Sequence, residues 1–299
     1  MRTFGVVVSC LVVSLLVAQS PRPAASVYAL EHGHCRIALG GTIDYTTGTS
    51  TTLTLKPYDG SGLVISGTQV HVPGRGVSIA NTGLSATTLY YVYGYSNSGS
   101  VALELSTMGH ATSTTAGNVG IEIKSGDDSR TLVGMVYTNA KAKFQDFTGD
   151  NSTPAVRTVL NWFNRRDLFL ASPGSGNGGC STSSTSFVEL CSSIWRMTML
   201  SWGDEAVIVG FSGIANNDTA GGRVNAVLAN LGHPNTPITS WFGTTSAAAR
   251  QFQNLSCNST MLMNLGTDGV SIVTLYAHVG GGTGGTATIY GNPYGMTRG

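Results

Sequence analysis

Two sets of carboxylates are the residues in this chain whose chemistry could be catalytic. Asp204 and Glu205 are adjacent, and Glu104 and Glu122 lie in separate segments of alternating apolar and polar residues. Glycosidases place two carboxyl groups roughly 5–9.5 Å apart across a sugar ring. Glu104 and Glu122 fall where solvent-facing strand positions are expected, which favours a structural role for them. A carbohydrate-active enzyme would therefore have to use Asp204 or Glu205.

A serine nucleophile is a weaker hypothesis. The segment Gly210–Gly213 is one residue out of step with the G-x-S-x-G motif and lacks a strand-to-helix context. Ser212, His233 and Asp204 could be combined into a triad on paper, but a chain this rich in serine makes the combination uninformative. We predict no catalytic residue from the sequence.

One short segment near the N-terminus has residues that suit a metal. His32, His34 and Cys35 offer imidazole and thiolate ligands for zinc or copper. They supply three ligands at most, and Cys35 is a candidate for oxidation. The expectation is a polar chain terminus with no metal and no cofactor.

The cysteines predict disulfides if the chain is exported. Cys10 lies in the N-terminal apolar segment, which leaves the even set Cys35, Cys180, Cys191 and Cys257. Cys180 and Cys191 flank a short Ser/Thr-rich loop, so we predict the pair Cys180–Cys191 and, by elimination, Cys35–Cys257. The alternative is that all four are buried thiols, as in a protein that matures in a cytosol.

Aromatic side chains are the residues best suited to bind a ligand without catalysis. Exposed Tyr and Trp on a rigid β scaffold can stack on sugar rings or form hot spots at a protein surface. Core packing is the favoured role for most of those in this chain. Tyr95 lies beside a turn and Trp241 lies in the loop-like segment 237–243, so we predict these two as ligand-binding residues.

The composition indicates the kind of protein that carries these residues. Of its 299 residues 41% are apolar and only 10% are charged, against about 25% charged in an average domain. The formal net charge is +1, and Arg165-Arg166 is the one basic cluster. Nucleic acids and anionic membranes are therefore poor candidates for partners. A polar but uncharged surface is typical of secreted and surface-exposed β proteins.

Residues 1–29 have the pattern of a secretory signal peptide. Arg2 precedes the apolar segment 4–18, and small residues follow at 24–29. The apolar segment is shorter than the about 20 residues that span a bilayer, although an uncleaved anchor is the alternative. We expect a protein that is secreted, periplasmic or on the cell surface, with no membrane span after cleavage.

Strand-like alternation recurs through the rest of the chain, and good helix formers are scarce. We predict an all-β fold of antiparallel β-sandwich or jelly-roll-like modules, with one short helix at Ala247–Asn254. The turn Ser96–Gly99 between alternating segments predicts a hairpin. A Gly/Ser-rich stretch at 171–186 divides a first module, 30–170, from a second, 187–299.

Residues 50–166 resemble a module of tail-fibre and other virion structural proteins from tailed phages and prophages. The match is carried by the segments Leu89–Tyr93, Leu103–Ser106 with Gly109-His110, Gly120–Asp127, Arg130–Val136 and Trp162–Arg165. The ending Leu275–Gly284 is weakly similar to the same proteins. The signal peptide is a departure, because tail proteins assemble in the cytoplasm.

This resemblance implies a function without catalysis. It suggests a structural or host-surface-binding β module, with a cell-surface polysaccharide or protein receptor as its partner and a homo-oligomer, such as a trimer, as its assembly. A virion is then the alternative location. The other two functions left open are a secreted carbohydrate-active enzyme and a structural surface protein without a ligand.

Overall fold

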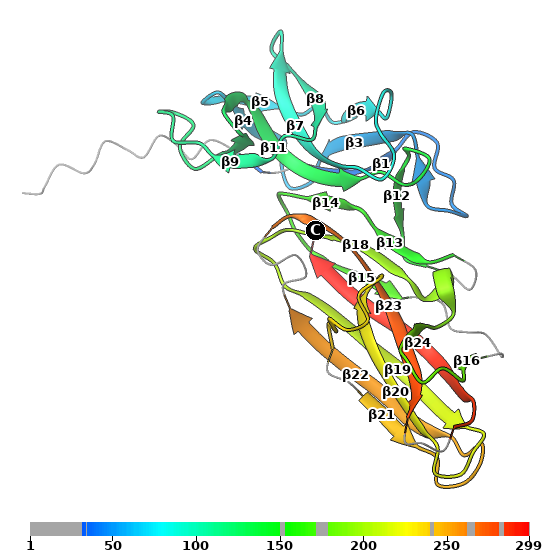
Figure 1. Cartoon of the computed structure of the whole chain (residues 1–299). Helices are drawn as coiled ribbons and strands as arrows, with labels where there is room; N and C mark the ends of the chain where they lie inside the picture. Colours follow the sequence, from blue (N-terminus) through cyan, green and yellow to red (C-terminus); the bar gives the residue numbers. More distant parts are fainter. Residues whose placement is uncertain are drawn as a thin grey trace, which may run out of the picture. The chain divides into compact units, whose positions relative to one another are not determined.

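Antiparallel β-strands are the main secondary structure of the protein, which we describe from a computed structural model (Figure 1). The structure describes residues 32–33, 35–149, 153–171, 179–239, 242–261, 267–280 and 284–298. The expected signal peptide, residues 1–29, lies outside them. Among these residues one short 3-10 helix, Ser192–Trp195, is the helical element, and none forms a helix that could span a membrane. The prediction of an all-β fold is confirmed.

Three sheets are built from strands between residues 35 and 161 (Figure 1). The first contains β1 (Cys35–Gly40), β3 (Thr52–Pro57) and β6 (Val77–Ala80). The second contains, in order, β8 (Ser100–Ser106), β7 (Leu89–Asn97), β11 (Asp127–Tyr137), β10 (Glu122–Lys124) and β9 (His110–Thr112), with β14 (Val159–Asn161) also paired to β11. The third is the hairpin of β4 (Gly62–Ile65) and β5 (Thr68–His71).

The predicted hairpin at Ser96–Gly99 is present as β7–β8. Its last pair is Asn97 with Ser100, so Ser98 and Gly99 form a two-residue loop. Both loop residues have positive φ, 50° and 82°. This is the backbone that the right-handed twist of paired strands favours, and glycine adopts it without strain.

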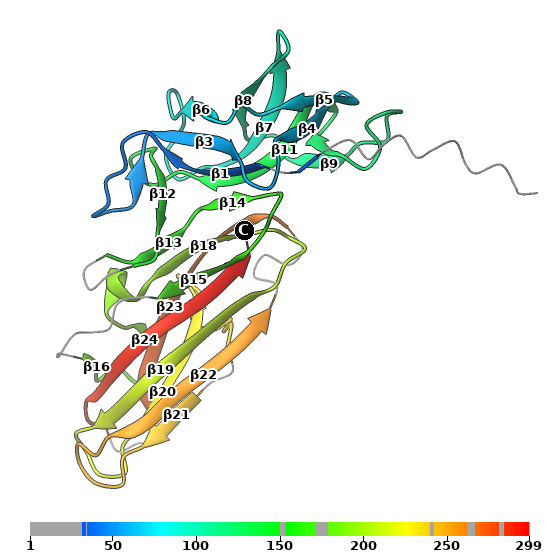
Figure 2. The same cartoon turned by 180° about the vertical axis from the view of Figure 1, so that it is seen from behind.

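Two further sheets stack as a sandwich (Figure 2). The larger contains, in order, β2 (Thr49–Ser50), β12 (Phe144–Phe147), β13 (Ala155–Arg157), β18 (Met197–Ser201), β23 (Gly269–Gly280), β20 (Arg223–Asn230) and β21 (Phe242–Thr245), with β17 (Val188–Glu189) on β23. The smaller contains β15 (Asp167–Ala171), β24 (Ala287–Arg298), β19 (Val207–Asn217) and β22 (Gln253–Met261), with β16 (Cys180–Thr182) on β24. Buried Met197 and Val273 from one sheet meet Val209 and Ile289 from the other in a single core.

The strands of this sandwich come from both sides of the stretch 171–186. Ala155 in β13 pairs in parallel with Met197 in β18, and β15 pairs with β24. Within the stretch itself, residues 172–178 lie outside the described residues and Cys180–Thr182 forms β16. Strands that precede the predicted linker therefore complete the sheets that follow it.

A second core cluster connects the β7–β11 sheet to the sandwich. Buried Tyr93 and Leu132 pack in it with Leu200 and Trp202. The indole N–H of Trp202 donates to the carbonyl of Asn161 over 3.1 Å. Burying a Trp with its N–H satisfied fixes the ring in place, and this ring lies beneath the site described below.

The predicted helix at Ala247–Asn254 is wrong. Residues 246–252 form turns, and β22 begins at Gln253. From Gln253 to Met261 the strand pairs with β19 along its whole length. Of the predicted helix, only Gln253 and Asn254 lie in this strand. The alanines precede it in a turn, where Gln251 N–H donates to the carbonyl of Ala248 and Arg250 N–H donates to that of Asn217. These tertiary and turn contacts override the weak helix preference of three consecutive alanines.

The cysteines confirm one predicted bridge and exclude the other. Cys180 and Cys191 form a disulfide. Cys257 carries a free thiol in β22 and packs against the sandwich core, whereas Cys35 is buried in a separate core with Ile37 and Leu53. The predicted pair Cys35–Cys257 is therefore wrong. The prediction only paired the two cysteines that were left over, and the fold places them in different cores.

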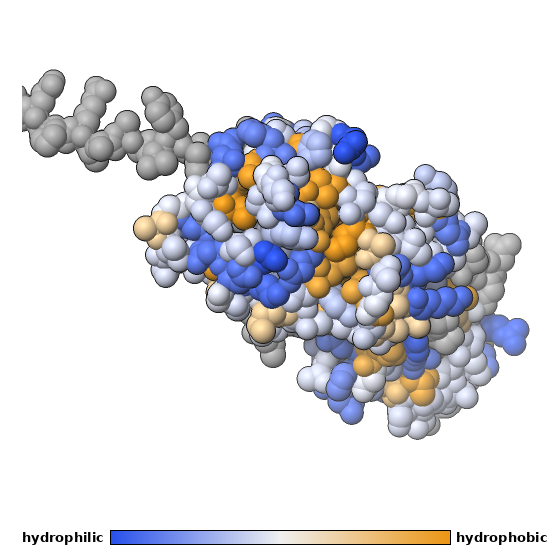
Figure 3. All heavy atoms as spheres, turned by 90° about the horizontal axis from the view of Figure 1, so that it is seen from above, coloured by the Kyte–Doolittle hydropathy of each residue, from blue (hydrophilic) through white to orange (hydrophobic). Residues whose placement is uncertain are grey.

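Apolar side chains also reach the surface. Seen from above, a band of apolar residues runs between groups of hydrophilic ones (Figure 3). Exposed large apolar side chains are spread along the chain, for example Tyr58, Met108, Phe169 and Phe252. Scattered exposed apolar residues are normal on a folded protein, so we look for a site where polar and aromatic groups converge.

Candidate functional site

An open groove of about 510 Å³ lies where the β7–β11 sheet meets two loops of the sandwich. It is lined by Tyr91, Gly109, His110, Ala111, Thr112, Glu122, Trp162, Gly203, Asp204, Thr267 and Asp268. Ser201 at the end of β18 pairs with Gly269 at the start of β23. That register brings the loop residues Gly203 and Asp268 together, because antiparallel strands end side by side.

His110 lies between two carboxylates of this groove. Its Nδ1 is 2.6 Å from Oε2 of Glu122, and its Nε2 is 2.9 Å from Oδ2 of Asp268. Ionised carboxylates only accept hydrogen bonds, so both ring nitrogens carry protons. Burial alone would lower the pKa of His110, but the hydrogen bonds to Asp268 and Glu122 outweigh burial and raise it. The two contacts and the raised pKa favour the imidazolium form of His110, which can donate to both acids at once.

Asp268 is the most heavily bonded acid of the groove. Its Oδ1 accepts from the backbone N–H of Gly203 over 2.8 Å while Oδ2 accepts from His110. Burial raises the pKa of Asp268, but these hydrogen bonds and one from Tyr91 lower it to a greater extent. Asp268 is thus held as a carboxylate, and it is an acceptor rather than a proton donor.

Arg165 organises the other end of the groove. Its Nη1 lies 2.6 Å from Oε1 of Glu205 and 3.2 Å from Oδ1 of Asp204. The guanidinium also lies over the ring of Trp162, 4.2 Å from its centroid, and Trp162 packs edge-on against Trp202. Glu205 is mostly buried, whereas 67% of the Asp204 side chain is exposed. Asp204 is therefore the carboxylate that the groove presents to solvent.

The carboxylate sets named from the sequence do not face each other across a cleft. Asp204 and Glu205 share one guanidinium, that of Arg165. Glu104 is bound by Lys124 at 2.6 Å and by Arg130 at 2.5 Å. It lies on β8, and the strands β7 and β11 separate it from β10, where Glu122 lies. Glu122 does line the groove, but beside His110.

Of the two predicted ligand-binding aromatics, Tyr95 is the one that the structure describes, and it lies outside the groove. The ring of Tyr95 lies under the guanidinium of Arg130, 4.2 Å from the centroid, and lines a separate shallow pocket with Glu104. Trp241 lies outside the described residues.

The remaining candidates have structural roles. Ser212 lies inside a sheet, paired with Ser256 on one side and Asn292 on the other, so it is not on a nucleophile elbow. His32 accepts from the N–H of Val64 over 2.9 Å and packs edge-on against a Phe ring. His34 lies outside the described residues. In the part of the chain that the structure describes, no three His, Cys, Asp or Glu side chains gather as a metal site.

Sequence reasoning missed His110 and Asp268 as partners. They are separated by 158 positions, and no local pattern connects them. Gly109-His110 was visible only as part of the family resemblance, and Asp268 directly precedes a strand. Asp268 could have been identified only from the pairing of β18 with β23, and the sequence alone does not predict that pairing.

Fold and site together define an all-β protein with a polar, partly aromatic groove. No family model and no curated protein matches the chain. Among solved structures, infectious bursal disease virus (Gx strain) is 13% identical with a TM-score of 0.32, over 90% of this chain and 72% of that one. The VP2 subviral particle of the same virus is 12% identical, with a TM-score of 0.32 over 90% and 73%. A xylan-binding module is 12% identical, with a TM-score of 0.24 over 44% and 97%. Scores this low carry no argument about function.

Proposed function

We propose that this protein is a non-enzymatic binding module that acts outside the cytoplasm and holds a hydroxyl-rich ligand, a cell-surface polysaccharide, in the groove. The observation that carries the proposal is the convergence of Asp204, Glu122 and Asp268 with the rings of Tyr91 and Trp162 in one open groove. Carboxylates accept hydrogen bonds from sugar hydroxyls, and aromatic side chains supply apolar surface for the ring faces. The Cys180–Cys191 disulfide supports an oxidising compartment.

The charges of the groove favour a neutral ligand. Glu122, Asp204, Asp268 and Glu205, which pairs with Arg165, outnumber His110 and Arg165 by two negative charges when all six are ionised. An acidic polysaccharide would be repelled by this excess. The ligand class that fits is therefore a neutral or amino-substituted glycan.

The same geometry argues against hydrolysis. A glycosidase needs one carboxyl group with a raised pKa as proton donor and a second one opposite it. Here His110 occupies the space between Glu122 and Asp268 and binds both. The pKa of Asp268 is lowered, which is the wrong direction for an acid catalyst.

A glycan array with the purified chain tests this function. We expect retention of neutral glycans by the wild type and weaker retention by Asp204→Asn, which removes the exposed carboxylate. Asp167→Asn, an exposed acid on β15 outside the groove, is the matched control and should bind like the wild type. Release of sugar fragments from a retained glycan would overturn the non-enzymatic proposal.

The phage-type structural role is supported by the family resemblance of residues 50–166. Fibre proteins act as assemblies, so this role requires a homo-oligomer such as a trimer. Sedimentation equilibrium at micromolar concentration should give a mass of three chains. A single-chain mass over that range would contradict a fibre-like role and leave the binding role standing.

A further inference from the structure

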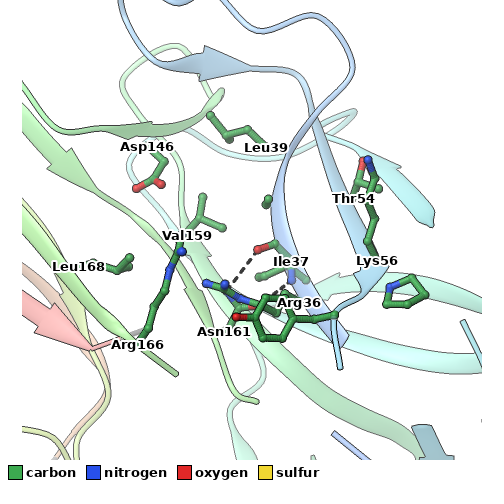
Figure 4. A pocket seen from close by; sticks show the side chains of 13 residues that line it. Arg36, Ile37, Leu39, Thr54, Lys56, Asp146, Val159, Asn161, Arg166 and Leu168 are labelled. Atoms are coloured by element: carbon green, nitrogen blue, oxygen red, sulfur yellow. Dashed lines mark hydrogen bonds between the residues drawn. The ribbon is translucent and has the colours of Figure 1, made fainter. Parts of the chain in front are cut away.

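A second cavity, of about 270 Å³, lies between the first sheet and the chain that follows β14 (Figure 4). Arg36, Thr54 and Lys56 reach it from β1 and β3, and Asp146 and Arg166 lie on the opposite side (Figure 4). It is slightly smaller than ordinary small-molecule sites, which enclose about 300–1,000 Å³. A ligand with a single ring would fill it.

The cavity lining carries more positive than negative charge, because its one carboxylate, Asp146, forms its ion pair with Arg157. Arg36, Lys56 and Arg166 line it. Within the described residues none of the three forms an ion pair, whereas Arg130, Arg157, Arg165 and Arg196 all do. Burial, and then the positive charge of Arg166, lower the pKa of Arg36. Both guanidiniums line the cavity, and their like charges repel each other.

Two buried polar atoms of the cavity lining are without a hydrogen bond among the described residues. They are Nε of Arg36, a donor, and Oδ1 of Asp146, an acceptor. Buried polar atoms are nearly always satisfied, so an unpaired donor and acceptor in one cavity indicate a missing partner. Solvent does not simply satisfy these two atoms, since the side chains of Arg36 and Asp146 are both partly buried.

The remaining lining is apolar and rigid. Ile37, Val159 and Leu168 are buried core residues that contribute to the wall. Two hydrogen bonds to the backbone of Ile37 fix the Asn161 side chain. Its Oδ1 accepts from the Ile37 N–H over 2.6 Å, and its Nδ2 donates to the Ile37 carbonyl over 3.2 Å. Tyr58 lies at the rim, with the Arg36 guanidinium 4.8 Å from its ring centroid. The apolar wall distinguishes this cavity from a site for a bare inorganic ion.

We propose that this cavity binds a small organic carboxylate up to the size of a hexuronic acid. The guanidiniums of Arg36 and Arg166 hold its carboxylate, Asp146 Oδ1 accepts from one of its hydroxyls, and the apolar wall covers its ring. Paired guanidiniums suit a carboxylate because their N–H donors match its two oxygens. This inference does not depend on the groove, whose charge is of opposite sign.

Calorimetric titration of the whole chain with D-glucuronate and with D-glucose tests the proposal. The two sugars differ only in the carboxylate. We expect glucuronate to bind at least about tenfold more tightly than glucose, since a charge-assisted pair accounts for that ratio. Equal binding of both sugars would overturn the proposal, as would equally tight binding of inorganic phosphate or sulfate.

Three variants locate the binding. Arg36→Gln and Arg166→Gln should each weaken glucuronate binding about tenfold or more. Because the Arg166 side chain is exposed, its replacement leaves the core intact. Arg75→Gln removes the same charge from an exposed residue that does not line the cavity and should change binding less than twofold. If Arg75→Gln weakens binding as much as Arg166→Gln, the attraction is a diffuse charge effect and the site does not exist.

Discussion

The Nε2 of His110 donates to Oδ2 of Asp268 over 2.9 Å, between residues 158 positions apart in the chain. This hydrogen bond joins β9 to the start of β23, and Nδ1 of the same ring binds Glu122 on β10. One imidazole therefore connects the β9–β10 strand pair with the sandwich. The groove owes its shape to this connection.

Removing His110 should destabilise the fold in a pH-dependent way. The folded-state pKa of His110 is raised, so its stabilisation is complete below the unfolded pKa of about 6.5 and is lost as the pH rises through the folded value. His110→Gln should lower the unfolding free energy by about 1–3 kcal/mol at pH 6 and by less at pH 9. Urea unfolding at both pH values measures this.

The exposed His233 provides the control, because it lies in a turn after β20. His233→Gln should leave the stability unchanged at both pH values. A His110→Gln effect that is equal at pH 6 and pH 9 would show that the imidazole acts by packing and not by its charge.

Loss of the Cys180–Cys191 bridge should matter more than loss of the Cys257 thiol. Cys180 and Cys191 close a loop with a sequence separation of 11. Replacing both by serine should cost about 2–3 kcal/mol, whereas Cys257→Ala should cost less. Alkylation of the denatured, unreduced chain should label Cys257 and leave Cys180 and Cys191 unmodified. Labelling of the latter pair would contradict the bridge.

The sheet contact at Gly134 should not accept a side chain. A Cβ there would lie 2.4 Å from the carbonyl oxygen of Leu160 and 2.5 Å from Cδ1 of Ile37. Gly134→Ala should therefore destabilise the protein by about 1–3 kcal/mol in urea unfolding. Gly74→Ala is the control, because no atom lies within 4 Å of its added Cβ, and it should be neutral. Equal effects of the two changes would mean that the chain shifts freely at Gly134.

Binding of an acid in the second cavity should strengthen as the pH falls. Burial raises the pKa of Asp146 to about 6, despite the nearby Arg157 and Arg166. Protonation of Asp146 removes a negative charge beside Arg166, so glucuronate should bind more tightly at pH 5 than at pH 7.5. Its own carboxylate stays ionised over this range. Calorimetry at both pH values tests this, and Asp146→Asn should remove the difference; a wild type without any difference would contradict it.

The sequence predicts much of the strand structure but not the site. Alternation and the Ser98-Gly99 turn predict the β7–β8 hairpin, because strand pairing across a two-residue loop is a local property. The helix at Ala247–Asn254 fails because its first part is held in a turn by contacts such as Arg250 N–H to the carbonyl of Asn217, and its last two residues pair with β19. Asp204 was named as a candidate, but its relation to Asp268 depends on the β18–β23 register. Long-range pairings of this kind leave no periodic signal in the chain.

Nuclear magnetic resonance mapping of a bound glycan tests the central claim most directly. A neutral glycan retained on the array is titrated into isotope-labelled protein, and shifts of the backbone amides are followed. We predict that the largest shifts cluster at Gly109, Ala111, Gly203 and Asp268, which line the groove, and that Asp204→Asn reduces them. Saturable shifts that cluster elsewhere, with these four amides unmoved, would contradict the groove as the binding site.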